Sequence, residues 1–301
     1  MPNIWSHIVF AQQCYELTHL PLPQERTLFQ LGCQGPDPLF YHHFLPWKKK
    51  KGADELGNVM HTQACGPFLV NLLTAAKEEK DIRSYVSGFV THHLLDRHTH
   101  PYIHYKAGYQ GYNHQRLEII LDTLIAKQLK GIETWRTPVY KELDVGDDLP
   151  ATLVHVLNHL GETFYPDQMR NVPQTIWNDA YQDMLKALHL FYDPWGVKTV
   201  LTAGKIAPFR YTKNLPAKDY LNESKQSWVH PALPDEQHAS SFWDLWENAL
   251  TEAKEILPLI YTFWEKDGEM APIRSRLGNL SYDNGKPCSA NLTNYLADPI
   301  V

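Results

Sequence analysis

Two histidine–carboxylate pairs at the same spacing constrain this 301-residue chain more than any other feature. His92 precedes Asp96 by four residues, and His114 likewise precedes Glu118 by four. On a helix, residues four apart lie on one face with their Cβ atoms roughly 5–6 Å apart. Two helices that each direct an imidazole and a carboxylate inward are one way in which a bundle core builds a polynuclear metal site. The spacing therefore predicts a helical, metal-dependent hydrolase.

Composition indicates which part of the chain carries the reactive residues, and it argues against a nucleic-acid partner. Of the 16 histidines, 11 lie within residues 1–118, so we expect the N-terminal part of the chain to carry the reactive groups. The net charge of −6 argues against broad nucleic-acid binding, which usually needs a basic surface. No nucleic-acid partner is therefore expected.

Cysteine usage and hydropathy bear on the compartment. The four cysteines are scattered and form no C-x-x-C pair, which predicts free thiols in a reducing compartment: Cys14, Cys33, Cys65 and Cys288. The first residues have no basic segment, and their apolar run is too short for a secretory leader. No stretch approaches the roughly 18 apolar residues of a membrane span. These features predict a cytoplasmic protein.

Apolar residues recur at helical spacing along most of the chain, and no convincing set of strands is evident. Helices are expected at residues 4–18, 24–32, 54–79 with a break at Gly66-Pro67, 113–129, 150–165, 174–191 and 241–263, and a central helix is expected to begin at its cap, Asp81. Pro101 is expected to end the central helix and to hold His100 in non-helical backbone. Ser241 and Asp244 have the spacing of a capping box. The expected fold is all-α, a multi-helix bundle in one domain (1–301), with metal-site helices in 1–125 and supporting helices plus an irregular C-terminal tail in 126–301.

The candidate metal ligands are imidazoles and carboxylates from separate segments. Zinc prefers such ligands at about 2 Å, and a catalytic site keeps one position open for water. The candidates are His61, His92, Asp96, His100, His114 and Glu118, with His7 and Asp37 as further possibilities. His155 and His159, followed by Glu162, form a rival set, but no second cluster accompanies them and a helix surface is favoured. The chain has no G-x-S-x-G, G-x-x-x-x-G-K-[ST], G-x-G-x-x-G or H-E-x-x-H motif, so other chemistries lack support.

A run of four lysines follows two aromatic residues, Phe44 and Trp47. Such a run, here Lys48, Lys49, Lys50 and Lys51, is typical of a solvated loop. Beside exposed aromatics it also fits contact with an anionic membrane, where each Lys near the surface is worth about 1 kcal/mol. We consider Phe44, Trp47, Tyr85 and Tyr102 as candidate walls of a substrate cleft.

Taken in order, the candidate ligands resemble the ligand pattern of the bacterial zinc-dependent phospholipase C family, whose all-helical fold is shared with the S1/P1-type nucleases. The resemblance covers about residues 1–120 and extends to both four-residue spacings. It implies the following ligand sets: His61, His92 and Asp96 for one zinc; His100, His114 and Glu118 for a second; His7 and Asp96 for a third. It also implies that Asp37 orients or deprotonates the attacking water.

The chain departs from that family pattern in two places. Secreted members begin, once processed, with a tryptophan whose amino group binds the third metal, whereas this chain begins Met1-Pro2 and has Trp5 two residues before His7. The number of zinc ions, two or three, therefore stays open. The interval from Asp96 to His100 is also shorter than in secreted members, so His98 stays an alternative to His100.

The function expected from these features is zinc-dependent hydrolysis of a small-molecule or lipid phosphodiester, with a metal-activated water as nucleophile. Metals about 3.5–4 Å apart lower the pKa of a bridging water and neutralise phosphate charge. The alternatives are a non-catalytic helical protein that keeps metal for stability or partner binding, and a nuclease acting on single strands. The acidic net charge counts against the nuclease.

Overall fold

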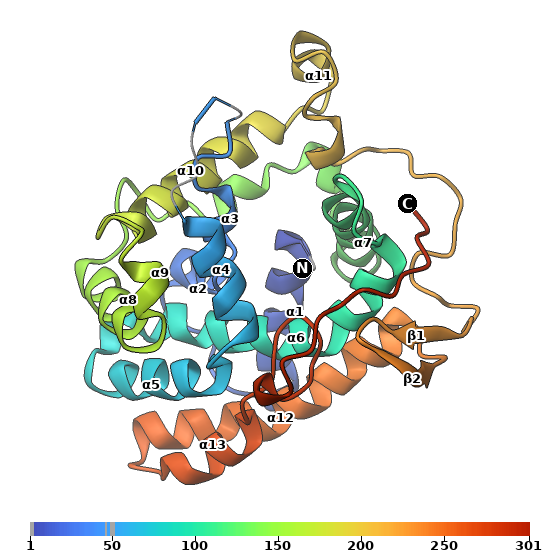
Figure 1. Ribbon diagram of the computed structural model, residues 1–301. Helices are drawn as coiled ribbons and strands as arrows, with labels where there is room; N and C mark the ends of the chain where they lie inside the picture. Colours follow the sequence, from blue (N-terminus) through green and yellow to red (C-terminus); the bar gives the residue numbers. More distant parts are fainter. Residues whose placement is uncertain (1–2, 46, 49–51) are drawn as a thin grey trace.

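The computed structural model describes residues 3–45, 47–48 and 52–301, and these fold into helices with one small sheet (Figure 1). The helices are α1 (Ile4–Thr18), α2 (Arg26–Gly32), α3 (Pro38–Tyr41), α4 (Ala53–Thr62), α5 (Cys65–Glu78), α6 (Arg83–Ala107), α7 (Asn113–Lys130), α8 (Ala151–Phe164), α9 (Pro166–Met169), α10 (Ile176–Phe191), α11 (Val197–Leu201), α12 (Phe242–Glu265) and α13 (Met270–Leu277). The strands are β1 (Trp228–His230) and β2 (Leu233–His238), which pair antiparallel. The all-α prediction is confirmed, and the prediction of no strands is wrong for this hairpin.

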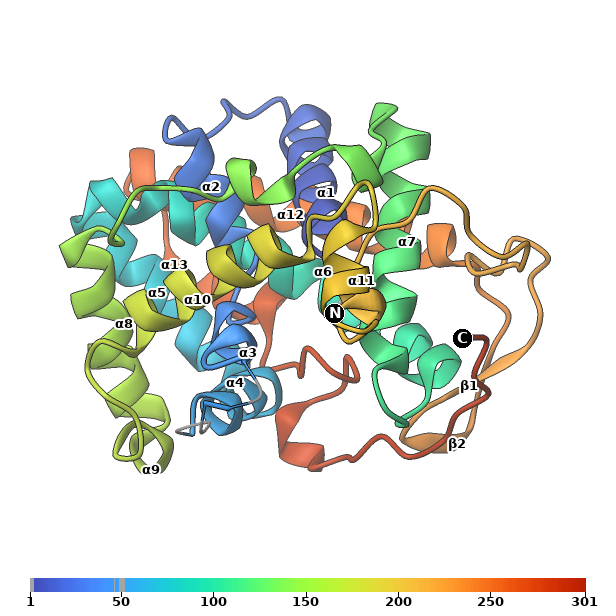
Figure 2. The same cartoon turned by 90° about the horizontal axis from the view of Figure 1, so that it is seen from above.

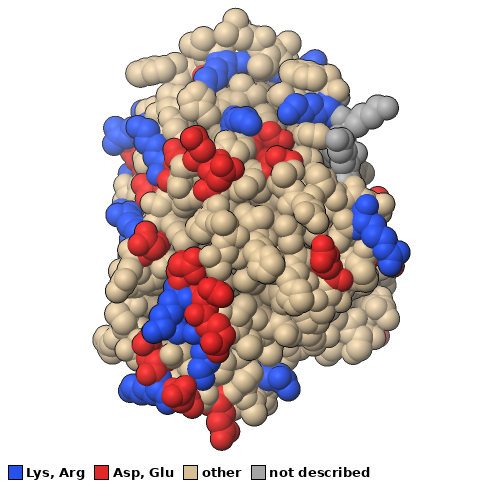
Figure 3. Space-filling view, turned by 90° about the vertical axis from the view of Figure 1, so that its left-hand side faces the viewer, with Lys and Arg blue, Asp and Glu red and all other residues tan. Residues whose placement is uncertain are grey.

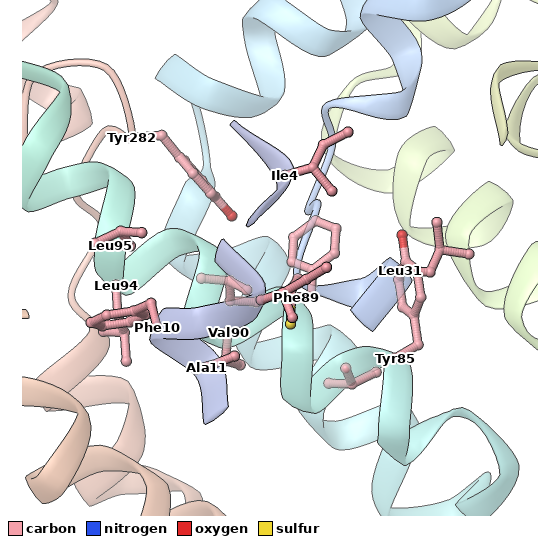
Figure 4. Close-up of a cluster of buried hydrophobic side chains, with 14 of the residues drawn as sticks. Ile4, Phe10, Ala11, Leu31, Tyr85, Phe89, Val90, Leu94, Leu95 and Tyr282 are labelled. Atoms are coloured by element: carbon pink, nitrogen blue, oxygen red, sulfur yellow. The ribbon is translucent and has the colours of Figure 1, made fainter. Parts of the chain in front are cut away.

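The long helix α6 is the central element of the fold. It packs against α1, α2, α5, α7 and α12, and nearly all of its residues are buried. Figure 4 shows side chains such as Phe10, Leu31, Phe89 and Leu94 filling the space where α1 and α2 meet it. A helix covered on all sides is normally apolar all round, yet α6 carries buried polar residues as well. The polar residues of α6 therefore require partners inside the protein.

The helix α6 also corrects the expectation about Pro101. It continues through Pro101 to Ala107, so His100 lies in helical backbone. A proline inside a helix removes one N–H and crowds the carbonyl four residues earlier, here that of Arg97. That carbonyl faces the C-terminal tail, since a Cβ on Gly285 would lie 2.3 Å from it. Packing on every side keeps α6 helical at Pro101, where the local sequence predicts that the helix ends.

Capping side chains define where two helices begin. The Ser241 side chain accepts the N–H of Asp244, and Asp244 accepts the N–H of Ser241, which confirms the capping box at the start of α12. The Asn3 side chain accepts the N–H of Ile4 at the start of α1. The first turn of α1 has a second acceptor, Asp122 of α7, which takes the N–H groups of Trp5 and Ser6. These contacts fix the N-terminal end of α1, which lies near the centre of the view in Figure 1.

The C-terminal tail, residues 278–301, crosses the front of the molecule between α4 and α7 (Figure 1). It is tied to the helices by backbone hydrogen bonds, among them Tyr282 N–H to the carbonyl of His61 and Ile300 N–H to the carbonyl of Lys106. Among the described residues, no helix combines the length and apolar character that crossing a bilayer requires.

Candidate metal centre

A row of polar residues on α6 forms the floor of the site. Asp96 is fully buried, and its two oxygens lie between histidines one turn away on either side. Asp96 Oδ2 is 3.0 Å from His92 Nε2, and Asp96 Oδ1 is 3.6 Å from His100 Nε2. Because α6 continues through Pro101, His100 is a four-residue neighbour of Asp96, as His92 is. His98 faces elsewhere and pairs with Glu252 at 2.8 Å, so the structure brings His100 into the cluster.

The helix α1 adds His7 above this row. His7 Nε2 lies 3.4 Å from Asp96 Oδ1, and its ring stacks on that of His92 with the centroids 4.1 Å apart. The Asp122 carboxylate holds this end of α1 through the N–H groups described above and the Ser6 hydroxyl at 2.6 Å. Asp122 was missed by sequence reasoning, although it continues the four-residue series His114, Glu118 on α7.

The segments before and within α4 bring a carboxylate and an imidazole to the other side. Asp37 immediately precedes α3 and lies between Pro36 and Pro38. Asp37 Oδ1 is 3.3 Å from His61 Nε2 and 3.7 Å from His92 Nε2. Asp37, His61 and His92 therefore offer three ligand atoms to one position, as His7, His92 and Asp96 do to another.

The helix α7 supplies the third group of ligand atoms. His114 Nε2 and Glu118 Oε1 are 2.7 Å apart, and the rings of His100 and His114 have centroids 6.0 Å apart. One atom each from His100, His114 and Glu118 lies within 4.8 Å of the others. The structure thus brings together all eight residues singled out from the sequence as ligands or as the base.

Backbone carbonyls orient three of the histidines. The Nδ1 atoms of His61, His92 and His100 lie 2.7, 3.0 and 3.0 Å from the carbonyl oxygens of Gly57, Cys33 and Tyr282. A carbonyl oxygen only accepts, so each Nδ1 carries a proton and each ring directs its Nε2 toward the carboxylates. Hydrogen bonds of this kind accompany most metal-binding histidines.

This orientation provides a test of whether a cation fits. With its Nδ1 held by the Cys33 carbonyl, His92 directs its Nε2 at the Asp96 oxygen 3.0 Å away. Within the described part of the chain, neither Asp96 oxygen has a hydrogen bond, nor does the Nε2 of His92 or His100. A buried carboxylate without a positive partner is costly. A divalent cation among these atoms would supply a positive partner for Asp96, and the donor set of imidazoles and carboxylates suits zinc.

The pKa shifts agree with this reading at most positions. Burial raises the pKa of Asp96 and lowers the pKa of His100 and His114 well below its usual value, so both imidazoles are neutral, as a metal ligand must be. Burial also lowers the pKa of His61, but the Asp37 carboxylate outweighs burial and raises it to about 8. A metal binding at His61 would therefore compete with a proton held against Asp37.

The C-terminal tail contributes two residues that sequence reasoning missed. The Tyr282 carbonyl is the acceptor for His100, and Asp283 Oδ1 lies 3.9 Å from both His100 Nδ1 and His104 Nε2. These residues follow His100 by more than 180 positions, and no spacing along the chain connects them with it. Residues from the supporting half of the chain therefore help to build the site.

The other histidine groups lie apart from this cluster. The rival set of His155, His159 and Glu162 lies exposed on the surface of α8. His42 Nδ1 is 3.7 Å from Asp183 Oδ2, but that carboxylate also has the ammonium groups of Lys48 and Lys186 at 4.0 and 3.8 Å. Two lysines already balance its charge, which disfavours a cation there.

The cluster opens into a cavity of about 980 Å³. Its polar end is formed by the ligand candidates and Asp283, and the remaining wall is largely apolar, with Phe40, Phe44, Met184, Leu188, Phe191, Ile206 and Phe209. The elements that line it surround the N-terminal end of α1 in Figure 1. Of the four aromatics considered as cleft walls, only Phe44 lines this cavity: Trp47 is 76 % exposed at the surface, and Tyr85 and Tyr102 are buried in the core. Packing against neighbouring helices, which the sequence does not specify, decides which aromatics reach a cavity.

Comparison with known proteins gives one match. The family model described as zinc dependent phospholipase C matches residues 6–160, just over half of the chain. The matched region contains all the ligand candidates, whereas α10, α11 and the tail lie beyond it. No curated protein and no solved structure matches the chain.

Proposed function

Because the chain belongs to the zinc-dependent phospholipase C family, we propose that it hydrolyses phosphodiesters with zinc bound in the buried cluster, and that lipid phosphodiesters are its substrates. The observation that carries the proposal is the convergence of buried imidazole and carboxylate atoms, with His92 Nε2 and Asp96 Oδ2 3.0 Å apart at its centre. A large and mostly apolar cavity beside this cluster suits a substrate that has a phosphate group and a hydrocarbon part.

We assign the metal ligands as the family resemblance implies. The proposed sets are His61, His92 and Asp96; His100, His114 and Glu118; and His7 with Asp96. The atoms of His100, His114 and Glu118 converge as one group, those of His7, His92 and Asp96 as a second, and those of His61 and His92 as a third with Asp37. Two zinc ions would be held by the first two sets, and a third would be held by His7 and Asp96. Zinc, when bound, lowers the pKa of a water to near neutrality and neutralises phosphate charge as it develops.

We assign the other steps, which are proton transfer, orientation of the ligands and binding of the substrate, to groups of the protein itself. Asp37 is at the cavity wall, and we assign it the role of general base that orients the attacking water and accepts its proton. The carbonyls of Gly57, Cys33 and Tyr282 fix the rings of His61, His92 and His100, which keeps the site in one arrangement. The apolar wall around Phe44 and Phe191 holds the hydrocarbon part of the substrate and excludes water from it.

The proposal is tested on protein that has never been exposed to a chelator. We expect at least two zinc ions per chain by elemental analysis, and hydrolysis of a chromogenic phosphodiester that stops with a chelator and returns with zinc. Asp37→Asn is expected to keep its tight zinc and to lose about 10²–10⁴-fold in kcat. The matched control is His159→Ala on the exposed face of α8, which should keep full activity. Less than one zinc per chain would refute the proposal.

The same preparation separates the alternatives. A structural zinc site closes its coordination shell, so a zinc-loaded chain that hydrolyses no phosphodiester would indicate a metal-stabilised binding protein. Cleavage of single-stranded DNA on a gel, with no action on lipid, would indicate a nuclease. The four cysteines form no disulfide, and a cytoplasmic location stays a prediction that cell fractionation can test.

A further inference from the structure

A short helical hairpin projects from the body of the molecule and exposes large apolar side chains. It comprises residues 194–209 around α11, which stands clear at the top of Figure 1 and faces the viewer in Figure 2. Trp195 is 86 % exposed, Val200 and Leu201 are each 80 % exposed, and no residue of α11 is buried. Contiguous apolar side chains in water usually mark a surface that a partner covers.

The hairpin is held in shape without burying these side chains. The buried Asp193 carboxylate accepts the N–H groups of Lys198 and Thr199 at 3.1 and 2.8 Å and the Thr199 hydroxyl at 2.7 Å. The Lys198 ammonium in turn donates to the carbonyl of Tyr192 at 3.0 Å. The fold therefore presents Trp195 and its neighbours in a fixed arrangement, although these side chains contribute little to stability where they are.

The charge of this part of the chain is opposite to that of the whole. The hairpin contains Lys198 and Lys205 and no aspartate or glutamate, and Arg210, Lys213 and Lys218 follow it before the next acidic residue, whereas the complete chain has a net charge of −6. The top of the molecule in Figure 3 shows mainly uncharged atoms with Lys and Arg among them, and most Asp and Glu side chains on this face lie lower. An apolar tip with basic residues around it is the pattern that inserts between anionic lipid headgroups.

The base of the hairpin forms part of the cavity wall. Lys205, Ile206 and Phe209 line the cavity, and Phe209 stacks on Phe191 with the ring centroids 4.9 Å apart. Phe209 also contacts Tyr112, 4.8 Å away between centroids, which is itself 57 % exposed. A surface that receives the hairpin would therefore lie beside this wall of the cavity.

From these observations we propose that the α11 hairpin docks the protein on an anionic lipid bilayer, with Trp195, Val200 and Leu201 in the interfacial layer. The hairpin lies beside the cavity, so a lipid could pass from the bilayer to the metal centre. This part of the inference rests on the proposed function. A five-residue helix is too small to supply the roughly 800 Å² per partner of a standard protein interface, which favours lipid over a second copy of this chain. Of the four-lysine run predicted to contact membrane, Lys48 is among the described residues, and Lys49, Lys50 and Lys51 lie outside them.

The test compares the full-length, zinc-loaded protein with a variant that carries Trp195→Ala and Leu201→Ala. Co-sedimentation is measured with vesicles of phosphatidylcholine mixed with phosphatidylserine, and with vesicles of phosphatidylcholine alone. The wild type should prefer the anionic vesicles, and the variant should bind them about 100-fold more weakly because two large apolar side chains no longer leave water. The matched control changes Leu22 and Tyr295, 56 % and 59 % exposed elsewhere, to Ala and should bind as the wild type does.

Two further readouts separate this inference from the proposed function. Hydrolysis of a soluble chromogenic phosphodiester should be equal in the wild type and the double variant; if neither is active but only the wild type binds vesicles, the proposed function fails and the docking surface stands. The docking inference is overturned if the wild type ignores anionic vesicles, if it binds neutral vesicles equally well, or if the double variant binds like the wild type. A change in sedimentation velocity caused by the double substitution alone would assign the hairpin to self-association and would also overturn it.

Discussion

Replacing Gly88 with alanine should separate α2 from α6 and thereby disturb the metal centre. A Cβ at position 88 would lie 2.3 Å from the carbonyl oxygen of Phe29 and 2.5 Å from the backbone nitrogen of Cys33. Ordinary contacts of a Cβ begin near 3.4 Å, so α2 would have to move by about 1 Å. Neither neighbour is a side chain that can rotate away. Gly88 thus allows the two helix backbones to touch.

The energetic consequence follows from two opposing terms. Overpacking a core typically costs about 1–3 kcal/mol, and a clash between two backbones belongs at the upper end. Alanine gains about 1 kcal/mol over glycine in a helix interior. We therefore expect Gly88→Ala to lower the free energy of unfolding by about 2 kcal/mol. The segment that moves also carries the Cys33 carbonyl that orients His92, and a misplacement of about 1 Å costs about 10²-fold in activity.

The assay is urea unfolding of the zinc-loaded protein, followed by zinc content and hydrolysis of a chromogenic phosphodiester. Gly161→Ala is the matched control, because there the Cβ meets the flexible end of Met169, with Sδ at 2.8 Å, which can shift. That variant should be as stable as the wild type or slightly more stable. If Gly88→Ala unfolded at the wild-type urea concentration and kept full activity, the close contact of α2 with α6 would not position the site.

Three further outcomes are expected. Burial raises the pKa of Asp122 to about 6, so the folded chain prefers the protonated acid; this preference stabilises the fold below about pH 4 and is lost as the pH rises through about 6. Wild type should therefore lose about 2 kcal/mol relative to Asp122→Asn between about pH 4.5 and 7, as measured by urea unfolding of both chains, and parallel profiles would contradict the argument. The hydrogen bond with its neighbouring thiol lowers the pKa of Cys288 to about 7, so its alkylation rate, followed by mass spectrometry, should rise with a midpoint near that pH, and a midpoint near 9 would refute it. Gly285→Ala should displace the tail that holds His100 and weaken zinc about 10–100-fold in a chelator competition, whereas Gly131→Ala, with a similar φ and nothing within 4 Å, should not.

The part of the site that follows from the sequence is the part that one helix determines alone. Four-residue spacing fixes the geometry of His92 with Asp96 and of His114 with Glu118, because the helix backbone sets it whatever packs around it. The same rule also connects Asp96 with His100, and the prediction of His100 left His98 open only because Pro101 was expected to end the helix. The error arose because a local rule was applied where packing on all sides of α6 prevails.

The part that could not be predicted depends on contacts between distant segments. The strongest example is the tail, where Tyr282 and Asp283 approach His100 although no pattern in the sequence links them. The choice of Phe44, and not Tyr85 or Tyr102, as a cavity wall is of the same kind. Such contacts are set by how helices pack, and one sequence carries no periodic signal for them.

The row of mostly polar residues on α6 contributes both to the candidate site and to the packing of the fold. Gly88, His92, Asp96, His100 and His104 follow one another at intervals of four, so the row begins at the contact with α2 and ends beside the tail. A buried row of this kind would destabilise a helical core by several kcal/mol per unpaired charge. The carbonyls that compensate part of this row come from the segment after α2, which binds His92, and from the tail, which binds His100. Binding of metal to this row would therefore also hold those segments against α6. The residues that bind metal would then stabilise the packing of the fold as well.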